Sequence, residues 1–152
     1  MLSGIMRTTT RWFLLFGFCG VVVGCGKGGP DIKTVPVEGK VAFQGGKPLT
    51  TGIVVFHPDA SKGNTNKHEA RGTIDEQGNY KLVSDAGKEG TPPGWYKVSV
   101  TSTTKDPKAK DEYAPPKWLI PTRYGDPGAS NVAFEVVENP EPGRYNIGIL
   151  NQ

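Results

Sequence analysis

Apolar residues recur at every second position in short stretches along most of the chain, and turn-forming residues separate these stretches. In the first stretch Val35, Val37, Val41 and Phe43 alternate with polar or small residues, which is the pattern of a strand with one buried face. The stretch 52–57 is apolar on both faces, which favours a central position in a sheet. The pattern predicts seven strands, at 35–43, 52–57, 70–75, 80–83, 95–101, 132–137 and 145–149.

The residues between these stretches predict how the strands are connected. Gly78 and Asn79 in the segment 75–80 favour a tight turn, so the strands on either side of it are expected to pair as a hairpin. Trp95 and Tyr96 are neighbours in one strand and must face opposite sides, so at most one of them lies in the core. With seven short strands and no helical period, the sequence predicts an all-β, antiparallel sandwich.

Composition narrows the protein class. All 13 Pro and 17 of the 21 Gly follow residue 24, a density that excludes a long helix or a coiled coil in the 128 residues from position 25 onward. A chain of 152 residues favours one domain. The net charge is +3, but Arg7 and Arg11 lie near the N-terminus, so the rest of the chain offers no basic surface and no nucleic-acid partner is expected.

The N-terminal segment has the three-part layout of a secretory signal peptide. Two arginines precede an uncharged run of 13 residues at 12–24, and small residues follow it. As a helix this run would span about 20 Å, which is too short for a hydrocarbon core of about 30 Å. We therefore expect export, with an uncleaved signal anchor as the open alternative.

The end of this run, 22–25 (Val-Val-Gly-Cys), resembles the bacterial lipobox. The resemblance implies a signal peptide at 1–24, an acylated Cys25 as the mature N-terminus, a tether over 25–33 and a folded domain over 34–152. Two or three acyl chains would anchor the protein stably in a membrane. Cys19 fits less well, because the bulky Phe18 precedes it. Gly26, the next residue, does not resemble an inner-membrane retention signal, so by resemblance we expect an envelope protein of the outer membrane that is periplasmic or surface-facing.

Five motifs between residues 37 and 98 resemble carboxypeptidase-regulatory-like domains. They are V-x-G-x-V at 37–41, G-x-P-L at 46–49, V-x-F at 54–56, D-x-x-G-x-Y-x-L at 75–82 and P-x-G-x-Y-x-V at 92–98. The later segment 120–127 resembles the region before the last strand pair in small bacterial lipoproteins with one such domain. The resemblance implies a transthyretin-like (prealbumin-like) seven-stranded sandwich with a structural or adhesive role, and fold alone does not define function.

His57 and His68 are the only histidines, and each has an acidic neighbour, Asp59 or Glu69. If the strands at 52–57 and 70–75 pair, the two imidazoles could lie opposite each other and form a divalent-metal site with those carboxylates. The alternative is a pair of exposed histidines at the ends of a loop. The number and spacing of these residues match no strong metal-binding motif.

Three aromatic residues, Tyr113, Trp118 and Tyr124, lie in the long proline-containing segment 104–131. A loop of this length is uncommon unless it has a function, and its rings could bind a glycan or a peptide. The alternative is that Trp118 and the apolar residues after it pin the loop onto the sandwich and close its open end.

No catalytic centre or cofactor site is expected. The chain lacks a Gly-x-Ser-x-Gly motif, and no Ser has an obvious His and Asp partner. The sequence therefore predicts a non-enzymatic, lipid-anchored envelope protein whose sandwich has a structural or protein-interaction role. A glycan- or peptide-binding module and a metal-binding periplasmic protein are the two alternatives.

Overall fold

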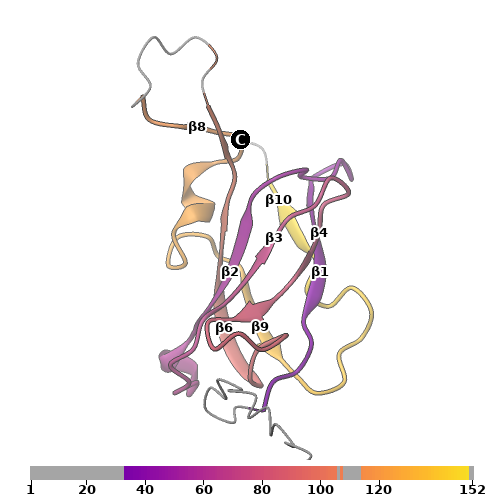
Figure 1. Ribbon diagram of the computed structural model, residues 1–152, viewed down its shortest axis with the longest axis vertical. Coiled ribbons are helices and arrows are strands. Elements are labelled where there is room, and N and C mark those ends of the chain that lie inside the picture. The colour runs from indigo at the N-terminus through magenta and orange to yellow at the C-terminus, as the bar shows by residue number, and fades with distance from the viewer. Residues whose placement is uncertain (1–32, 106, 108–113, 151–152) are drawn as a thin grey trace, which may run out of the picture.

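The computed structural model describes residues 33–105, 107 and 114–150, and these residues fold almost entirely into strands and turns (Figure 1). The helical segments in these ranges are two short 3-10 helices, η1 (Ala60–Lys62) and η2 (Thr122–Gly125). The all-β prediction is confirmed. The strands of the described residues are β1 (Glu38–Phe43), β2 (Ile53–Pro58), β3 (Ala70–Thr73), β4 (Asn79–Lys81), β5 (Val83–Ser84), β6 (Gly94–Thr101), β7 (Thr103–Thr104), β8 (Lys117–Trp118), β9 (Ala133–Val136) and β10 (Ile147–Ile149).

Each of the seven predicted stretches contains at least one strand, but the described residues hold ten strands in all. The stretch predicted at 80–83 is divided between β4 and β5. The short strands β7 and β8 pair with each other at the start of the segment 104–131, from which no strand was expected.

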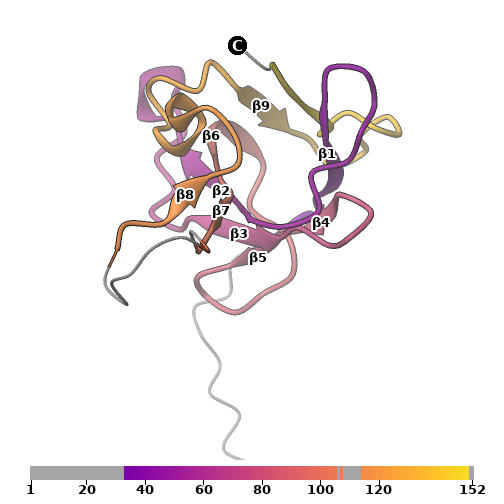
Figure 2. The same cartoon turned by 90° about the horizontal axis from the view of Figure 1, so that it is seen from above.

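Two main sheets form the body of the fold. A five-stranded sheet has the order β5-β3-β2-β6-β9, and a three-stranded sheet has the order β10-β1-β4. Viewed from above, the five-stranded sheet curves round one side of the molecule while β1 and β4 lie on the other side (Figure 2). The strand β2 lies between β3 and β6, which confirms its predicted central position.

One pairing differs from the antiparallel prediction. The strands β1 and β10 are parallel, with Val41 opposite Ile147 and Phe43 opposite Ile149. The reason is that β10 does not pair with β9, the strand before it in the chain: β9 pairs with β6 in the five-stranded sheet. A segment that leaves one sheet and enters the other is free to meet its new neighbour in either direction.

The predicted hairpin between 70–75 and 80–83 is also wrong in part. The turn forms, and the N–H of Asp75 donates to the carbonyl of Asn79. After the turn, however, β4 pairs with β1 in the three-stranded sheet, and β3 pairs instead with β5. The turn therefore carries the chain from one sheet to the other. The two strands separate because Tyr80 and Leu82 are buried between the sheets.

The core lies between the two sheets and is centred on Phe56. Its ring contacts four other aromatic rings, with centroid separations of 5.9 to 6.4 Å. Two come from other strands of the same sheet (Tyr96, Phe134), and two come from β4 and from the residues just before β10 (Tyr80, Tyr145). The pair with Phe134 is stacked and the other three are tilted or edge-on, and aromatic pairs in such arrangements add to the stability that burial provides.

Alternation along β6 decides which of its side chains face the core. Tyr96, Val98 and Val100 are fully buried, whereas Trp95 is only partly buried on the outer face. The prediction that at most one of the two adjacent aromatic residues lies in the core is confirmed.

Candidate functional site

Three polar side chains form a row across the outer face of the five-stranded sheet. Glu69 directly precedes β3, His57 lies in β2 and Ser99 lies in β6. Oε1 of Glu69 is 2.7 Å from Nδ1 of His57, and Nε2 of His57 is 2.9 Å from Oγ of Ser99. Because an ionised carboxylate can only accept, Nδ1 of His57 donates to Glu69, and Nε2 shares a second hydrogen bond with the hydroxyl of Ser99.

Strand register explains why these three residues meet. Phe56 pairs with Ala70 across β2 and β3, and both side chains face the core. The neighbouring positions, His57 and Glu69, therefore project from the opposite face. Ser99 also faces outward, because it lies between the buried Val98 and Val100. Side chains on the same face of adjacent antiparallel strands lie within contact distance of one another.

This row corrects the expectation that no serine has a histidine and an acidic partner. His57 and Ser99 are 42 residues apart in the chain, and Glu69 lies 12 residues from His57. No local motif connects them, so only the register of three strands could have revealed the row.

The distances are those of a nucleophile, a base and an orienting carboxylate. The surroundings of Ser99 do not suit acyl transfer, however. Ser99 is only 5% exposed. The N–H of Val98 donates to Val132 on one side of β6, so the N–H of Ser99 points to the other side, toward β2, and cannot face an oxyanion. The geometry fits a hydrogen-bonded lock across three strands better than a catalytic centre.

The second histidine belongs to a different pair. Nδ1 of His68 is 2.6 Å from Oδ1 of Asp85, a residue that the sequence had not linked to it. Asp59, which was expected to share a metal site, accepts hydrogen bonds from Ser61. In the part of the chain that the structure describes, no group of three or more His, Cys, Asp or Glu side chains is arranged to hold a metal ion. The two imidazoles thus contact separate carboxylates.

The aromatic residues of 104–131 lie differently from the ligand-binding expectation. Tyr124 in η2 is buried, and its hydroxyl accepts from the N–H of Leu150 at 2.9 Å. Trp118 in β8 is partly buried and lies over Gly125, where an added Cβ would be only 2.5 Å from the indole. Ile120, which lies between Trp118 and Tyr124 in the sequence, is also buried. Tyr113, the third predicted residue, lies outside the described residues. The ring of Tyr124 is therefore part of the core and cannot stack on a ligand, and the placement matches the loop-pinning alternative.

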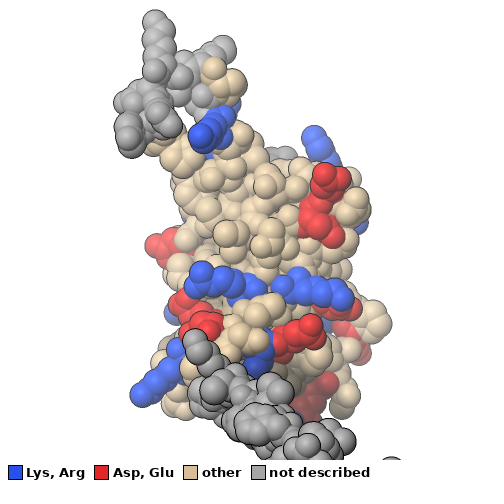
Figure 3. All heavy atoms as spheres, viewed as in Figure 1, with Lys and Arg blue, Asp and Glu red and all other residues tan. Residues whose placement is uncertain are grey.

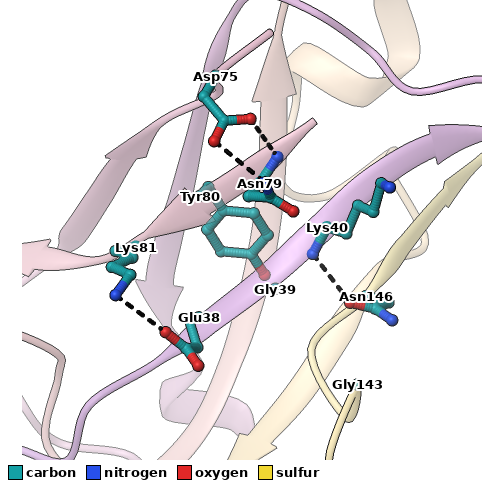
Figure 4. Close-up of a pocket in the computed structure, with 9 residues that line it drawn as sticks. All are labelled: Glu38, Gly39, Lys40, Asp75, Asn79, Tyr80, Lys81, Gly143 and Asn146. Carbon is teal, nitrogen blue, oxygen red and sulfur yellow. Dashed lines mark hydrogen bonds and ion pairs between the residues drawn. The ribbon is translucent and has the colours of Figure 1, made fainter. Parts of the chain in front are cut away.

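A shallow hollow opens where β1, β4 and the segment before β10 meet (Figure 4). At its base the hydroxyl of Tyr80 donates to the carbonyl of Tyr145 at 2.6 Å. An added Cβ at Gly39 would be 2.4 Å from the same carbonyl oxygen, so only glycine fits beside this contact. Burial raises the pKa of Tyr80 well above its usual range, and Tyr145 raises it further. The tyrosine therefore stays protonated and joins the two strands.

The rim of this hollow is charged and polar. Lys81 pairs with Glu38 at 3.3 Å, and the N–H of Lys40 donates to Oδ1 of Asn146. On the far side Asp75 accepts from the N–H and the side-chain amide of Asn79 (Figure 4). These bonds, the backbone N–H of Asn79 above all, hold the pKa of Asp75 below its usual value. The side chains of the rim are engaged with one another, so they close the turn and the strand edges.

A second hollow is formed by the loop after β2 and the entry to β6. It is lined by the residues around Trp95 at one side and by the segment 62–66 at the other. Nζ of Lys62 lies 3.7 Å from the centroid of the Trp95 ring, which is a cation–π contact. The amide of Asn64 donates to the carbonyl of Trp95 at 2.8 Å and fixes the loop against the strand. The alternating pattern at 95–101 placed Trp95 in a strand, but nothing in the sequence connected it with Lys62.

The predicted lipidation site, Cys25, lies outside the described residues, and so does the predicted signal peptide at 1–24. No helix among the residues from 33 onward that the structure describes is long and apolar enough to cross a membrane. Comparisons of the chain with protein families, with curated proteins and with solved structures found no match.

Proposed function

We propose that the protein is a lipid-anchored component of a bacterial cell envelope, and that its β-sandwich serves as a structural or protein-interaction module rather than as an enzyme. The observation that carries the proposal is the motif at 22–25, Val-Val-Gly-Cys, which ends an uncharged run of 13 residues. A run of that length suits an export signal, and the cysteine directly after it suits acylation.

The burial of Ser99, whose own N–H points into the sheet toward β2, supports the non-enzymatic part of the proposal. Because Gly26 does not resemble an inner-membrane retention signal, the proposal places the anchor in the outer membrane. The protein's partners are then the membrane itself, through the acyl chains on Cys25, and an envelope protein or glycan.

Intact-mass measurement of protein extracted from membranes tests the anchor. We expect a chain that begins at Cys25 and carries the added mass of two or three acyl chains. Cys25→Ser removes this mass and releases or mislocates the protein, whereas the matched variant Cys19→Ser keeps it. A mature chain without acyl mass contradicts the proposal.

We also propose that the domain is a transthyretin-like sandwich, the fold that its carboxypeptidase-regulatory-like motifs imply. Two observations support this: the strands fall into two facing sheets, and the motif segments 37–41, 54–56 and 92–98 all contribute to the shared core. Nuclear Overhauser contacts between Val41 and Ile147 in solution would support the parallel pairing of β1 and β10. A different neighbour for β1 would contradict the proposed topology.

A further inference from the structure

We infer that the end of the sandwich that carries Trp95 and Lys62 docks onto the headgroup region of the membrane in which the protein is anchored. This inference rests on the proposed acylation of Cys25. It adds an orientation to that proposal, with one defined end of the domain in contact with lipid.

Only a short stretch of chain separates the proposed anchor from the fold. Lys33 is the first described residue and lies eight positions after Cys25. Even a fully extended chain of eight residues reaches at most about 29 Å. The end of the sandwich at which the described chain begins, at the bottom of Figure 1, is therefore the end attached to the anchor, and it stays within about 29 Å of it.

Trp95 lies at this same end of the sandwich. Val35 and Thr91 exchange two backbone hydrogen bonds, of 2.9 and 3.1 Å, close to the start of the described chain. The chain runs from Thr91 through two prolines directly into β6, of which Trp95 is the second residue. Trp118 marks the opposite end, since β8 pairs with β7 just after β6 has ended. The eight residues of β6 separate the two ends by about 26 Å.

The surface around Trp95 combines exposed apolar groups with a positive charge. Trp95 and Pro92 are partly exposed, Pro93 is exposed, and the ammonium of Lys62 lies over the indole. An indole at the headgroup level places its apolar ring toward the acyl chains and its N–H toward water, and a lysine beside it attracts anionic headgroups. The loop that carries Lys62 is already fixed by the left-handed Gly63 at the end of η1 and by Asn64, so docking requires little ordering.

The positions of the charged residues at this end indicate which of its surfaces contacts the membrane. Lysines, arginines and acidic residues are intermingled over the lower half of the surface in Figure 3, so net charge alone does not drive docking. Glu138 and Glu141 line a hollow together with Val35 that shares no residue with the Trp95 hollow, and Glu138 is paired with Lys33. The docked surface is therefore the one with Trp95 and Lys62, and the acidic loop faces away from the lipid.

Tryptophan quenching by brominated lipids tests the inference. The acylated protein is purified from membranes and placed in vesicles of phosphatidylethanolamine and phosphatidylglycerol, with and without bromine near the headgroup end of the acyl chains. Trp118→Phe leaves Trp95 as the tryptophan of the mature chain, and Trp95→Phe leaves Trp118. We expect lipid bromine to quench Trp95 strongly and Trp118 hardly at all.

Lys62→Gln tests the contribution of charge. We expect it to reduce the ratio of docked to undocked protein by about fivefold in vesicles that contain phosphatidylglycerol. Lys117→Gln, a matched change of an exposed lysine in β8 at the opposite end, should leave the ratio unchanged.

The outcomes separate this inference from the proposed anchor. Protein without acyl mass overturns the anchor and the docking together. Acylated protein in which Trp95 is not quenched, or in which both tryptophans are quenched equally, overturns the docking alone. If Trp95 instead responds to soluble peptidoglycan fragments and not to brominated lipid, the hollow is a glycan site and the docking inference is wrong.

Discussion

The two faces of the five-stranded sheet are held together by different interactions, although the same strands and the same register build both. On the inner face Phe56, Tyr96 and Val98 are fully buried against the other sheet. On the outer face the neighbouring positions His57 and Ser99 join the strands through hydrogen bonds. Burial of apolar area stabilises the inner face without regard to direction, whereas the outer row depends on distances and on a protonation state.

The largest effect is expected on the inner face. Phe56→Ala removes the ring at the centre of the aromatic cluster and leaves a cavity, which should cost about 3–5 kcal/mol of unfolding free energy. Chemical denaturation monitored by circular dichroism measures this loss. Phe56→Leu, a smaller change, keeps the comparison measurable if the alanine variant does not fold.

Val55→Ala is the matched control for this prediction. Val55 is the residue before Phe56 in β2, but it faces outward and is only partly buried. We expect a clearly smaller loss of stability, because less apolar area leaves the core. Equal losses at the two positions would contradict the distinction between the faces.

A smaller effect is expected from a buried polar contact within the three-stranded sheet, between β4 and the segment before β10. Tyr80→Phe removes the hydroxyl that donates to the carbonyl of Tyr145 and leaves that buried oxygen with one partner fewer, at a cost of about 1–3 kcal/mol. Equilibrium unfolding measures it. The ring and its burial are unchanged, so a loss as large as that of Phe56→Ala would point to a wider rearrangement.

The alkaline limb of stability gives a second readout of Tyr80. Burial raises the pKa of this tyrosine in the folded protein, so its contribution to stability is full below the usual tyrosine pKa of about 10. It is lost as the pH rises from there, because only the unfolded chain ionises readily. Stability should therefore fall less steeply above pH 10 in Tyr80→Phe than in the unaltered protein.

The apolar character of the inner face could be predicted from sequence, whereas the outer row of hydrogen bonds could not. The two differ in how far apart along the chain the residues lie on which each depends. A pattern within a few residues, the continuous apolar run at 52–57, indicated the central strand that carries Phe56. The contact between His57 and Ser99 depends on the register of two strands that are distant in the chain. A one-residue shift of that register would separate the two side chains.

The same limit applies to two other parts of the fold. The turn at 75–80 was predicted from local residues and forms, but the sheet that β4 joins is decided by the burial of Tyr80. For Tyr124 the sequence left ligand binding and loop pinning as alternatives. Its hydroxyl accepts from the N–H of Leu150, close to the C-terminal end of the described chain, a contact that no local pattern indicates.

The outer row should contribute less than either inner-face contact. Ser99→Ala or His57→Ala removes the hydrogen bond between them, at an expected cost of about 1 kcal/mol each. The double variant should cost less than the sum of the two single variants, because both remove the same interaction. Additive losses in this double-mutant cycle would show that the two residues are not coupled and that the row is not a lock.

The smallest effect, and the most dependent on conditions, is expected at the turn that carries the chain from one sheet to the other. Asp75→Asn keeps an oxygen that can accept from the N–H of Asn79 but removes the negative charge. Those hydrogen bonds hold the pKa of Asp75 below its usual value, so its ionised form stabilises the fold above about pH 4, and this contribution is lost as the pH falls through the lowered pKa. The variant should be less stable than the unaltered protein at neutral pH, and the difference should disappear in acid. Thermal unfolding between neutral and acidic pH measures both curves. Glu76→Gln removes the same charge from the next, exposed position, and if it reproduces the effect, the general charge of the turn rather than the Asp75 hydrogen bonds is responsible.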